Sequence, residues 1–369
     1  MDLGRRMILA LNCGSSSLKY ALFKDEEVVL RGAIDRIGAG GASDHAAAVH
    51  AVFDELESRD VAAPRAVGHR LVHGGPDHTE PERVTDALLR SLARAVPFAP
   101  LHLPAELRAI EAVRARFGDL PQVVCFDTAF HRTLPDVARR FALPASLFDA
   151  GVRRYGFHGL SYEYVVASLG PKLGARAVLA HLGSGASMVA VLEGRAIDTT
   201  MGFTPTGGLV MGTRSGDLDP GLVVYLLEHG DYDAASLGRL VNHQAGLLAL
   251  SGTTSDMRTL LEQRATDPRA ALAVEVFCYQ ARKWIGALAA ALGGLDTLVF
   301  TGGIGEHATA VRHEICRGLA HLGVTLDEAR AGAGEPILGR TARCEVHVVA
   351  TDEERMIARR TRRALGSGG

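Results

Sequence analysis

Short apolar runs alternate with longer amphipathic stretches along most of the chain. Runs of three to six apolar residues bounded by polar or turn-forming residues predict buried strands, and the stretches between them have helical spacing. This alternation is typical of an α/β protein. The predicted strands cover residues 8–11, 18–23, 28–30, 123–126, 178–180, 188–192, 298–300 and 346–350.

The clearest helix is predicted between the start signal Asp267-Pro268 and the stop signal Gly293-Gly294. It is followed by the strand at 298–300, a glycine turn at 302–305 and a helix ending near residue 323. A strand, a glycine turn and a helix in this order suit the binding of a nucleotide phosphate. The apolar stripe of the long helix carries Phe277, Trp284, Leu288 and Leu292.

One short sequence motif occurs twice in the chain. The first copy, LNCGSSS at 11–17, and the second, HLGSGAS at 181–187, each connect an apolar strand to a returning apolar strand through a turn of small residues. Such turns expose backbone N–H groups and hydroxyls, which suits phosphate. Two copies predict a duplicated fold with two phosphate-binding hairpins, and the second copy places the domain boundary near residue 150.

Length, charge and cysteine content narrow the class of protein. A chain of 369 residues can form two domains, and a net charge of -2 does not favour nucleic acid or an anionic membrane as partner. The N-terminal apolar run at 7–11 is too short for a signal-peptide core or a membrane span, so we expect a cytoplasmic protein. The five cysteines are scattered and indicate neither a disulfide framework nor a zinc site.

Several polar clusters interrupt the apolar context. They combine Arg, His and Asp, which phosphoryl transfer needs as fixed positive charge and as a carboxylate near the metal or nucleophile. A single His or Asp at a strand end more often has a structural role. The clusters lie at residues 68–75, 101–102, 126–131, 154–159 and 211–217.

Common nucleotide-binding motifs are absent from the sequence. There is no GxxxxGK[ST] motif and no HRDxxxxN or DFG motif, so neither a P-loop NTPase nor a protein kinase is supported. Residues 303–308 fit only the loose GxGxxA form of the dinucleotide fingerprint, so a Rossmann dehydrogenase is a poor second interpretation.

Seven blocks, in order over essentially the whole chain, resemble the signature blocks of the acetate kinase family. The resemblance implies an α/β fold of two duplicated ribonuclease H-like (actin-like ATPase) domains with an active site in the interdomain cleft. It also implies reversible phosphoryl transfer from ATP to acetate, giving acetyl phosphate and ADP, with Mg²⁺ or alternatively Mn²⁺, and a homodimer. The blocks are residues 12–19, 68–75, 126–131, 154–159, 201–205, 211–217 and 351–354.

The resemblance implies roles for individual residues. Asn12 and Glu353 would hold the metal, and Arg70 and Arg214 would flank the carboxylate and the phosphoryl group. His158 would stabilise the transition state with Arg214. Asp127 would orient acetate and metal, or act as a base; positioning is favoured because acetate is already ionised at neutral pH. The residues implied near the transferring phosphate are Ser15, Ser17 and Lys19.

Two further groups follow from the same resemblance. The nucleotide-binding residues are His181, Leu182, Gly183, Ser184, Gly185, Asp256, Met257, Arg258, Gly303, Ile304, Gly305, Glu306 and His307. The apolar cup for the acetate methyl group consists of Val72, Leu101, Phe157 and Pro205. One methylene is worth only ~1–3 kcal/mol in such a pocket, so propionate should be a poorer substrate rather than an excluded one.

The chain also departs from the family pattern. Leu103, Ser184, His307 and Asp352 stand where the family commonly has Asn, and Leu160 and Tyr162 where it has Thr and His. The departures at Ser184 and His307 affect purine preference, and Asp352 adds a carboxylate beside Glu353. From sequence alone, Glu353 has an alternative role in the first turn of a helix capped by a Thr351–Glu354 capping box.

Two alternative functions stay open. One is a propionate or butyrate kinase, and the more remote one is a nucleotide-gated ATPase without kinase activity. The expected domains are residues 1–150 with 352–369, on the acetate and metal side, and residues 151–351, which bind nucleotide and form the dimer.

Overall fold

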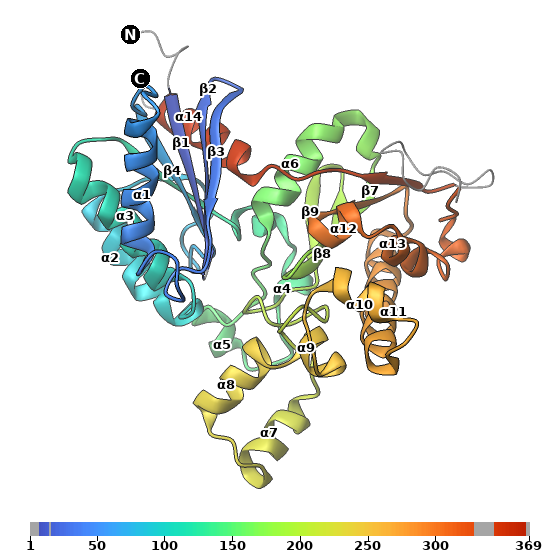
Figure 1. Cartoon of the computed structure of the whole chain (residues 1–369). Coiled ribbons are helices and arrows are strands. Elements are labelled where there is room, and N and C mark those ends of the chain that lie inside the picture. Colours follow the sequence, from blue (N-terminus) through green and yellow to red (C-terminus); the bar gives the residue numbers. More distant parts are fainter. Residues whose placement is uncertain (1–6, 15, 328–342, 367–369) are drawn as a thin grey trace. The chain divides into compact units, whose positions relative to one another are not determined.

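The computed structural model describes residues 7–14, 16–327 and 343–366. The chain divides into two compact units. Unit 1 comprises the chain up to Arg132, Gly159–Tyr164 and the segment from Asp352 onward; Figure 1 draws it mainly in blue. Unit 2 comprises Thr133–His158 and Val165–Thr351, mainly in green to orange.

Unit 1 contains a six-stranded sheet in the order β3-β2-β1-β4-β6-β5. Its first three strands form an antiparallel meander, whereas β4 and β6 join β1 in parallel. The strands are β1 (Met7–Cys13), β2 (Leu18–Lys24), β3 (Glu27–Ile34), β4 (Ala66–Leu71), β5 (Glu82–Arg83) and β6 (Gln122–Phe126).

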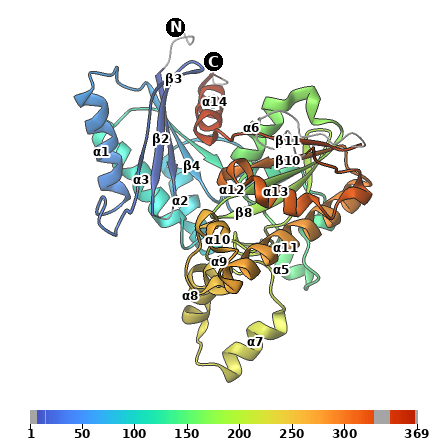
Figure 2. The same cartoon turned by 45° about the vertical axis from the view of Figure 1, so that its right-hand side comes forward.

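Alternate residues of β1 supply the two faces of this sheet. Leu9 and Leu11 belong to a core with α1 (His45–Ser58) and α3 (Leu103–Phe117), while Ile8 and Ala10 belong to a core with α14 (Glu353–Gly366). This period of two is that of a strand buried on both faces. Figure 2 shows α1 and α3 on one side of the sheet and α14 on the other. The helix α2 (Asp86–Ala95) packs beside α3.

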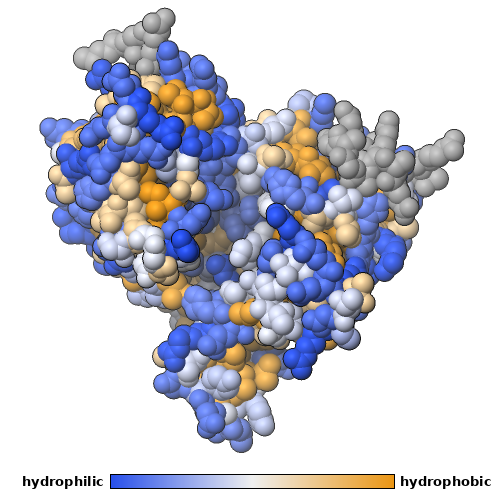
Figure 3. Space-filling model, viewed as in Figure 1, coloured by the Kyte–Doolittle hydropathy of each residue, from blue (hydrophilic) through white to orange (hydrophobic). Residues whose placement is uncertain are grey.

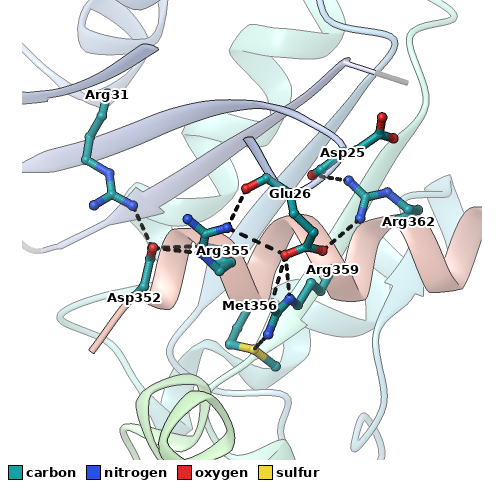
Figure 4. Close-up of polar contacts among 8 residues, drawn as sticks. All are labelled: Asp25, Glu26, Arg31, Asp352, Arg355, Met356, Arg359 and Arg362. Atoms are coloured by element: carbon teal, nitrogen blue, oxygen red, sulfur yellow. Dashed lines mark hydrogen bonds and ion pairs between the residues drawn. The ribbon is translucent and has the colours of Figure 1, made fainter. Parts of the chain in front are cut away.

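Polar contacts also attach α14 to the sheet. Glu26, in the turn between β2 and β3, forms ion pairs with Arg355, Arg359 and Arg362 of α14 (Figure 4). These side chains are partly exposed, so each pair contributes only ~0–1 kcal/mol, and burial of the apolar face of α14 is the larger stabilising contribution.

Unit 2 contains a five-stranded sheet in the order β11-β10-β7-β8-β9. Its principal helix, α11 (Pro268–Leu292), packs on β7, β8 and β9. The strands are β7 (Arg176–Leu182), β8 (Ala186–Leu192), β9 (Arg195–Thr199), β10 (Thr297–Thr301) and β11 (Glu345–Val348). The other helices with residues in this unit are α4 (Asp136–Arg139), α5 (Ala145–Asp149), α6 (Gly159–Leu169), α7 (Pro220–His229), α8 (Ala234–His243), α9 (Gly246–Ser251), α10 (Met257–Gln263), α12 (Gly302–His307) and α13 (Thr309–Cys316).

The two sheets share one topology. Read in reverse, the unit 2 order β9-β8-β7-β10-β11 matches β3-β2-β1-β4-β6 of unit 1, with the same parallel and antiparallel pairings. Each meander also has one register shift in its middle strand, at Leu22/Phe23 and at Ala190/Val191. The predicted duplicated α/β fold is confirmed.

Local predictions can be compared with the structure. The long helix is confirmed, with Asp267 as N-cap and Gly293 as a left-handed C-cap. The predicted glycine turn at 302–305 is wrong, because these residues form the first turn of α12. The segment 133–150, expected in the first domain, belongs to unit 2, where Thr133 Oγ1 donates to the carbonyl of Ala196 in β9. None of the helices in the described ranges combines the length and apolar character that crossing a membrane requires.

Candidate active site

The end of β1 meets the first turn of α14 in unit 1. The amide Nδ2 of Asn12 donates to Glu353 Oε2 at 2.8 Å and to Glu354 Oε1 at 2.9 Å. Burial and the neighbouring Asp127 carboxylate raise the pKa of Glu353 to about 6, although Arg70 opposes the shift. Two carboxylates and an amide oxygen are therefore gathered at one strand end.

Arg70, at the end of β4, lies beside this group. Its Nε and Nη2 donate to Asp127 Oδ2 at 3.0 and 2.6 Å, and its Nη1 donates to the carbonyl of Cys13 at 2.9 Å. Burial acts to lower the pKa of Arg70, but Asp127, Glu353 and Glu106 together raise it above its ordinary value. The guanidinium is a permanent cation fixed by both a carboxylate and the backbone.

Asp127 follows β6 directly and is 1% exposed. Only its Oδ2 is bound by Arg70; its buried Oδ1 makes no hydrogen bond to any described residue. A buried carboxylate oxygen without a partner is costly, so its retention points to a ligand that occupies it.

A second buried carboxyl group, Glu106 of α3, lies on the other side of Arg70. It is 2% exposed, its Oε1 is 3.9 Å from Arg70 Nη1, and both its oxygens accept from the Val72 N–H, at 3.2 and 3.0 Å. Burial raises the pKa of Glu106 to about 8, with Arg70 and the Val72 N–H opposing the shift.

We call Asn12, Arg70, Glu106, Asp127 and Glu353 the carboxylate cluster. Its hard oxygen donors, with one buried carboxylate oxygen unpaired, fit Mg²⁺, which binds one or two carboxylates together with water and substrate phosphates. Within the described ranges, no group of three or more His, Cys, Asp or Glu side chains is arranged to hold a metal.

The other predicted residues of unit 1 lie at different depths. Val72 is buried, whereas Leu101 is half exposed and Lys19 is exposed on β2, opposite Asn12. The carbonyl of Ser17 closes the hairpin by accepting from Gly14 N at 2.8 Å. Ser15 lies outside the described residues.

In unit 2, His158 immediately precedes α6 and has a left-handed backbone, with φ of 59°. Its Nδ1 is 2.8 Å from the hydroxyl of the buried Ser187, and its ring stacks on His181 with centroids 4.2 Å apart. A non-glycine residue in this conformation is uncommon, and surrounding contacts must maintain it. The Ser187 hydroxyl and the His181 ring thus contact the His158 ring on its Nδ1 side and on its face.

The side chain of Arg214 also approaches Gly185, from the loop that precedes α7. Its Nη1 donates to the carbonyl of Pro205 at 3.1 Å. A Cβ atom built on Gly185 would lie 3.4 Å from His158 Nε2 and 3.5 Å from Arg214 Nη1, so both side chains converge on this glycine. We call His158, His181, Gly185, Ser187 and Arg214 the histidine–arginine cluster.

Backbone atoms of several predicted nucleotide-binding segments lie around the turn between β7 and β8. The carbonyl of Ser184 accepts from Gly212 N at 2.9 Å, and a Cβ on Gly212 would meet Ser255, beside Asp256, at 3.4 Å. A Cβ on Gly183 would lie 3.9 Å from the N atom of Gly303 in α12. The second Gly-Ser turn thus contacts the loop before α7 and the start of α12, and the loop before α7 in turn lies against the residues that precede α10.

Some predicted nucleotide residues have evident structural roles in this arrangement. The Glu306 carboxylate accepts from the N–H groups of Gly302 and Thr351, and the Asp256 side chain caps α10 by accepting from Arg258 N. Met257 is buried, whereas Arg258 and His307 are exposed. The remaining members lie at the end of β7, in the β7–β8 turn or in α12: His181 and Leu182, Ser184, and Ile304 and Gly305 respectively. Phe157 is buried and Pro205 is partly buried.

The departures from the family pattern separate into two groups. Leu103, Leu160 and Tyr162 are buried and pack as ordinary core residues, whereas Ser184 is exposed. Asp352 does not join Glu353: its carboxylate pairs with Arg31 and Arg355 (Figure 4).

Asp352 also caps α14 by accepting from Arg355 N at 3.1 Å. The predicted Thr351–Glu354 capping box is therefore wrong. The buried Thr351 hydroxyl makes no hydrogen bond to a described residue, and the Glu354 carboxylate accepts from Asn12.

Sequence reasoning missed Glu106, Glu354 and Ser187. A signal existed for Glu106, because it lies at helical spacing with the buried Leu103, Ile110 and Val113. A charged residue on an apolar stripe indicates a buried charge with a specific partner.

Comparison with known proteins gives full-length matches. The model of the acetokinase family matches residues 38–359. An acetate kinase of Rhodopseudomonas palustris is 45% identical, with 98% of this chain and 99% of that protein covered. The solved acetate kinase of Porphyromonas gingivalis is 37% identical, with a TM-score of 0.89 over 98% of this chain and 100% of that one. A solved propionate kinase of Francisella tularensis is 35% identical, with a TM-score of 0.91 over 96% and 98%.

Proposed function

Since this chain belongs to the acetokinase family, we propose that it is an acetate kinase. The reaction is reversible transfer of the ATP γ-phosphoryl group to the acetate carboxylate, giving acetyl phosphate and ADP. The observation that carries the proposal is the 45% identity to an acetate kinase over 98% of the chain.

The carboxylate cluster binds and orients the acceptor and the metal. Arg70 is held by Asp127 and the Cys13 carbonyl, so its remaining N–H groups are available to the acetate carboxylate. Val72, Leu101, Phe157 and Pro205 supply the contacts to the methyl group.

Asn12 and Glu353 are the proposed metal ligands, and the unpaired Oδ1 of Asp127 orients the metal and the acceptor. Mg²⁺, or alternatively Mn²⁺, would neutralise charge on the nucleotide phosphates. Asp127 has no proton to remove, because acetate is ionised at neutral pH.

The histidine–arginine cluster stabilises the transferring phosphoryl group. Arg214 and His158 Nε2 present two donors to equatorial oxygens, and Gly185 permits close approach because it lacks a side chain. Ser187 orients the His158 ring through Nδ1. The β7–β8 turn and the start of α12, with Asp256, Met257 and Arg258, bind the nucleotide, while Ser15, Ser17 and Lys19 lie on the phosphate side.

A coupled assay tests the proposal. The purified chain should form hydroxylamine-trappable acyl phosphate with ATP, Mg²⁺ and acetate, and none when acetate is omitted. Hydrolysis of ATP that no carboxylate accelerates would contradict it and favour a nucleotide-gated ATPase.

A propionate kinase is the second candidate, favoured by one observation. The solved propionate kinase superposes with a TM-score of 0.91, slightly above 0.89 for the acetate kinase. Because one methylene is worth ~1–3 kcal/mol, the ratio of kcat/KM for acetate and propionate decides between them. A ratio above one supports acetate kinase, and a ratio below one supports propionate kinase. Butyrate belongs in the same series.

We also propose a homodimer in the cytoplasm, the compartment in which ATP is abundant. In α7, no residue is buried, and Leu222, Val224, Tyr225 and Leu227 are 42%, 50%, 58% and 43% exposed. Figure 3 shows apolar side chains at the surface near α7 and α8. Covering this helix with a second copy removes the apolar area from water. Light scattering should give a dimer for the chain and a monomer for Leu222→Glu/Tyr225→Glu.

A further inference from the structure

We propose that Glu106 is a positioning residue for the acceptor, holding the end of β4 so that Arg70 and Val72 keep the geometry that binds acetate. The inference rests on the proposed function, in which Arg70 meets the carboxylate and Val72 the methyl group. Glu106 touches neither substrate and acts through these two residues.

The hydrogen bonds at the end of β4 carry the argument. The strand ends at Leu71, so the Val72 N–H has no ladder partner and donates instead to both oxygens of Glu106, at 3.0 and 3.2 Å. A buried backbone N–H without an acceptor costs roughly 1–3 kcal/mol. Glu106 therefore fixes the position at which the chain leaves the sheet, one residue beyond Leu71.

The same carboxyl group faces the Arg70 guanidinium. Its Oε1 is 3.9 Å from Nη1, beyond hydrogen-bond distance, so this carboxyl group borders the guanidinium without binding it. Among described residues, three of the five N–H groups of Arg70 donate, to Asp127 and to the Cys13 carbonyl. Glu106 thus packs beside the guanidinium without occupying the two N–H groups left for the substrate.

Burial excludes a merely solvated role for this side chain. Glu106 is 2% exposed on the apolar stripe of α3, where a leucine would complete the core. The next glutamate of that helix, Glu111, is exposed and provides a matched control.

Three substitutions separate positioning from bulk packing. Glu106→Gln keeps an oxygen that can accept from Val72, whereas Glu106→Leu keeps the approximate volume and removes the acceptor. Glu106→Asp keeps the carboxyl group and withdraws it by one methylene. Each variant, with Glu111→Leu as control, is assayed by trapping acetyl phosphate while acetate and ATP are varied in turn.

We expect Glu106→Leu to raise KM for acetate about tenfold or more, with KM for ATP within about twofold of the unchanged protein. Glu106→Gln should restore KM for acetate to within about threefold, and Glu111→Leu should change neither constant. If the leucine variant does not fold, Glu106→Asp replaces it, with an expected rise of several-fold in KM for acetate alone.

Two results would overturn the inference. One is an unchanged KM for acetate in every folded variant that lacks or withdraws the acceptor, and the other is an equal rise in both KM values. Failure of the proposed function looks different, because the unchanged protein and Glu111→Leu would then form no acetyl phosphate at all.

Discussion

The hairpins β1–β2 and β7–β8 occupy the same position in two sheets of one topology but present different chemistry. Asn12 and His181 are equivalent by register, since each is the last but one residue of its first strand. Asn12 donates to two carboxylates of α14, whereas His181 stacks on His158. The duplicated scaffold supplies two strand ends, and the residues arriving from outside the hairpin decide what each end binds.

The ionisable groups of the two clusters differ. In unit 1 the carboxyl groups of Glu106, Asp127 and Glu353 surround one arginine, and in unit 2 His158 and Arg214 converge on Gly185. An acidic site favours a metal cation, and a cationic site favours phosphoryl oxygens. The difference predicts that substitutions in the two units change different kinetic constants.

The largest expected effect comes from removing the Arg214 guanidinium of unit 2. Arg214→Ala should lower kcat by roughly 10³-fold or more, as expected for an arginine that contacts a transferring phosphoryl group. Arg195→Ala, at an exposed arginine at the start of β9, serves as the control. Stopped assays with saturating acetate and ATP measure kcat for both variants. A near-normal kcat in Arg214→Ala would contradict the proposed contact between Arg214 and the phosphoryl group.

The two turn glycines should respond unequally to the same added methyl group. Gly185→Ala places a Cβ in van der Waals contact with His158 Nε2 and Arg214 Nη1, at 3.4 and 3.5 Å, where it would occupy the space proposed for the transferring phosphoryl group and cost roughly 10–100-fold in kcat. In Gly14→Ala the nearest atom is Ser17 Oγ at 3.0 Å, which rotation of that side chain can relieve. We therefore expect a smaller loss; equal losses would contradict the assigned difference between the turns.

Stability should fall with rising pH because of unit 1. The pKa of Glu106 is about 8 in the folded protein against ~4.3 when unfolded, so between these values the folded state holds the extra proton. The free energy of unfolding therefore decreases as pH rises from about 5 towards 9, and Glu353, with a pKa of about 6, adds to the decrease at the lower end. Thermal melts of Glu106→Gln should show a weaker pH dependence; parallel curves for both proteins would exclude this residue as the cause.

The smallest expected effect concerns the ion pairs that attach α14 to the sheet of unit 1. Glu26→Gln weakens the pairs that join α14 to the β2–β3 turn and should lower the stability of unit 1 by about 1 kcal/mol. Glu27→Gln, at the exposed neighbouring residue, is the control. Urea titrations at low and high salt measure the free energy of unfolding of both variants. Added salt screens the ion pairs of Glu26, so it should reduce the difference in stability between Glu26→Gln and Glu27→Gln.

Much of the fold could be predicted because its signals are local. The repeated Gly-Ser phrase and the flanking apolar runs indicate the duplication, and Asp267-Pro268 and Gly293 delimit the longest helix through capping and backbone preferences. Gly302 shows the limit of such signals. Its φ of 76° is compatible with a turn, yet the following residues continue into α12 because the Glu306 side chain accepts from the Gly302 N–H.

The candidate site was predictable only as far as motifs extend. Asn12, Arg70, Asp127 and Glu353 lie in recognisable blocks, and the structure brings them together in unit 1. Glu106 lies in no block, and its contacts with Val72 and Arg70 depend on how α3 packs beside β4, which sequence spacing does not encode. The same holds for Asp352, whose pairing with Arg31 requires a tertiary contact across 321 residues.

The place of α14 at the end of the chain has a consequence for biosynthesis. This last helix covers the face of the first strand, β1, and supplies Glu353 and Glu354 to Asn12. At ~5–20 residues per second, β1 leaves the ribosome some tens of seconds before the helix that covers it. Unit 1 therefore completes its core only once α14, up to residue 366, has emerged, while the sheet of unit 2 already has its five described strands when residue 348 has emerged.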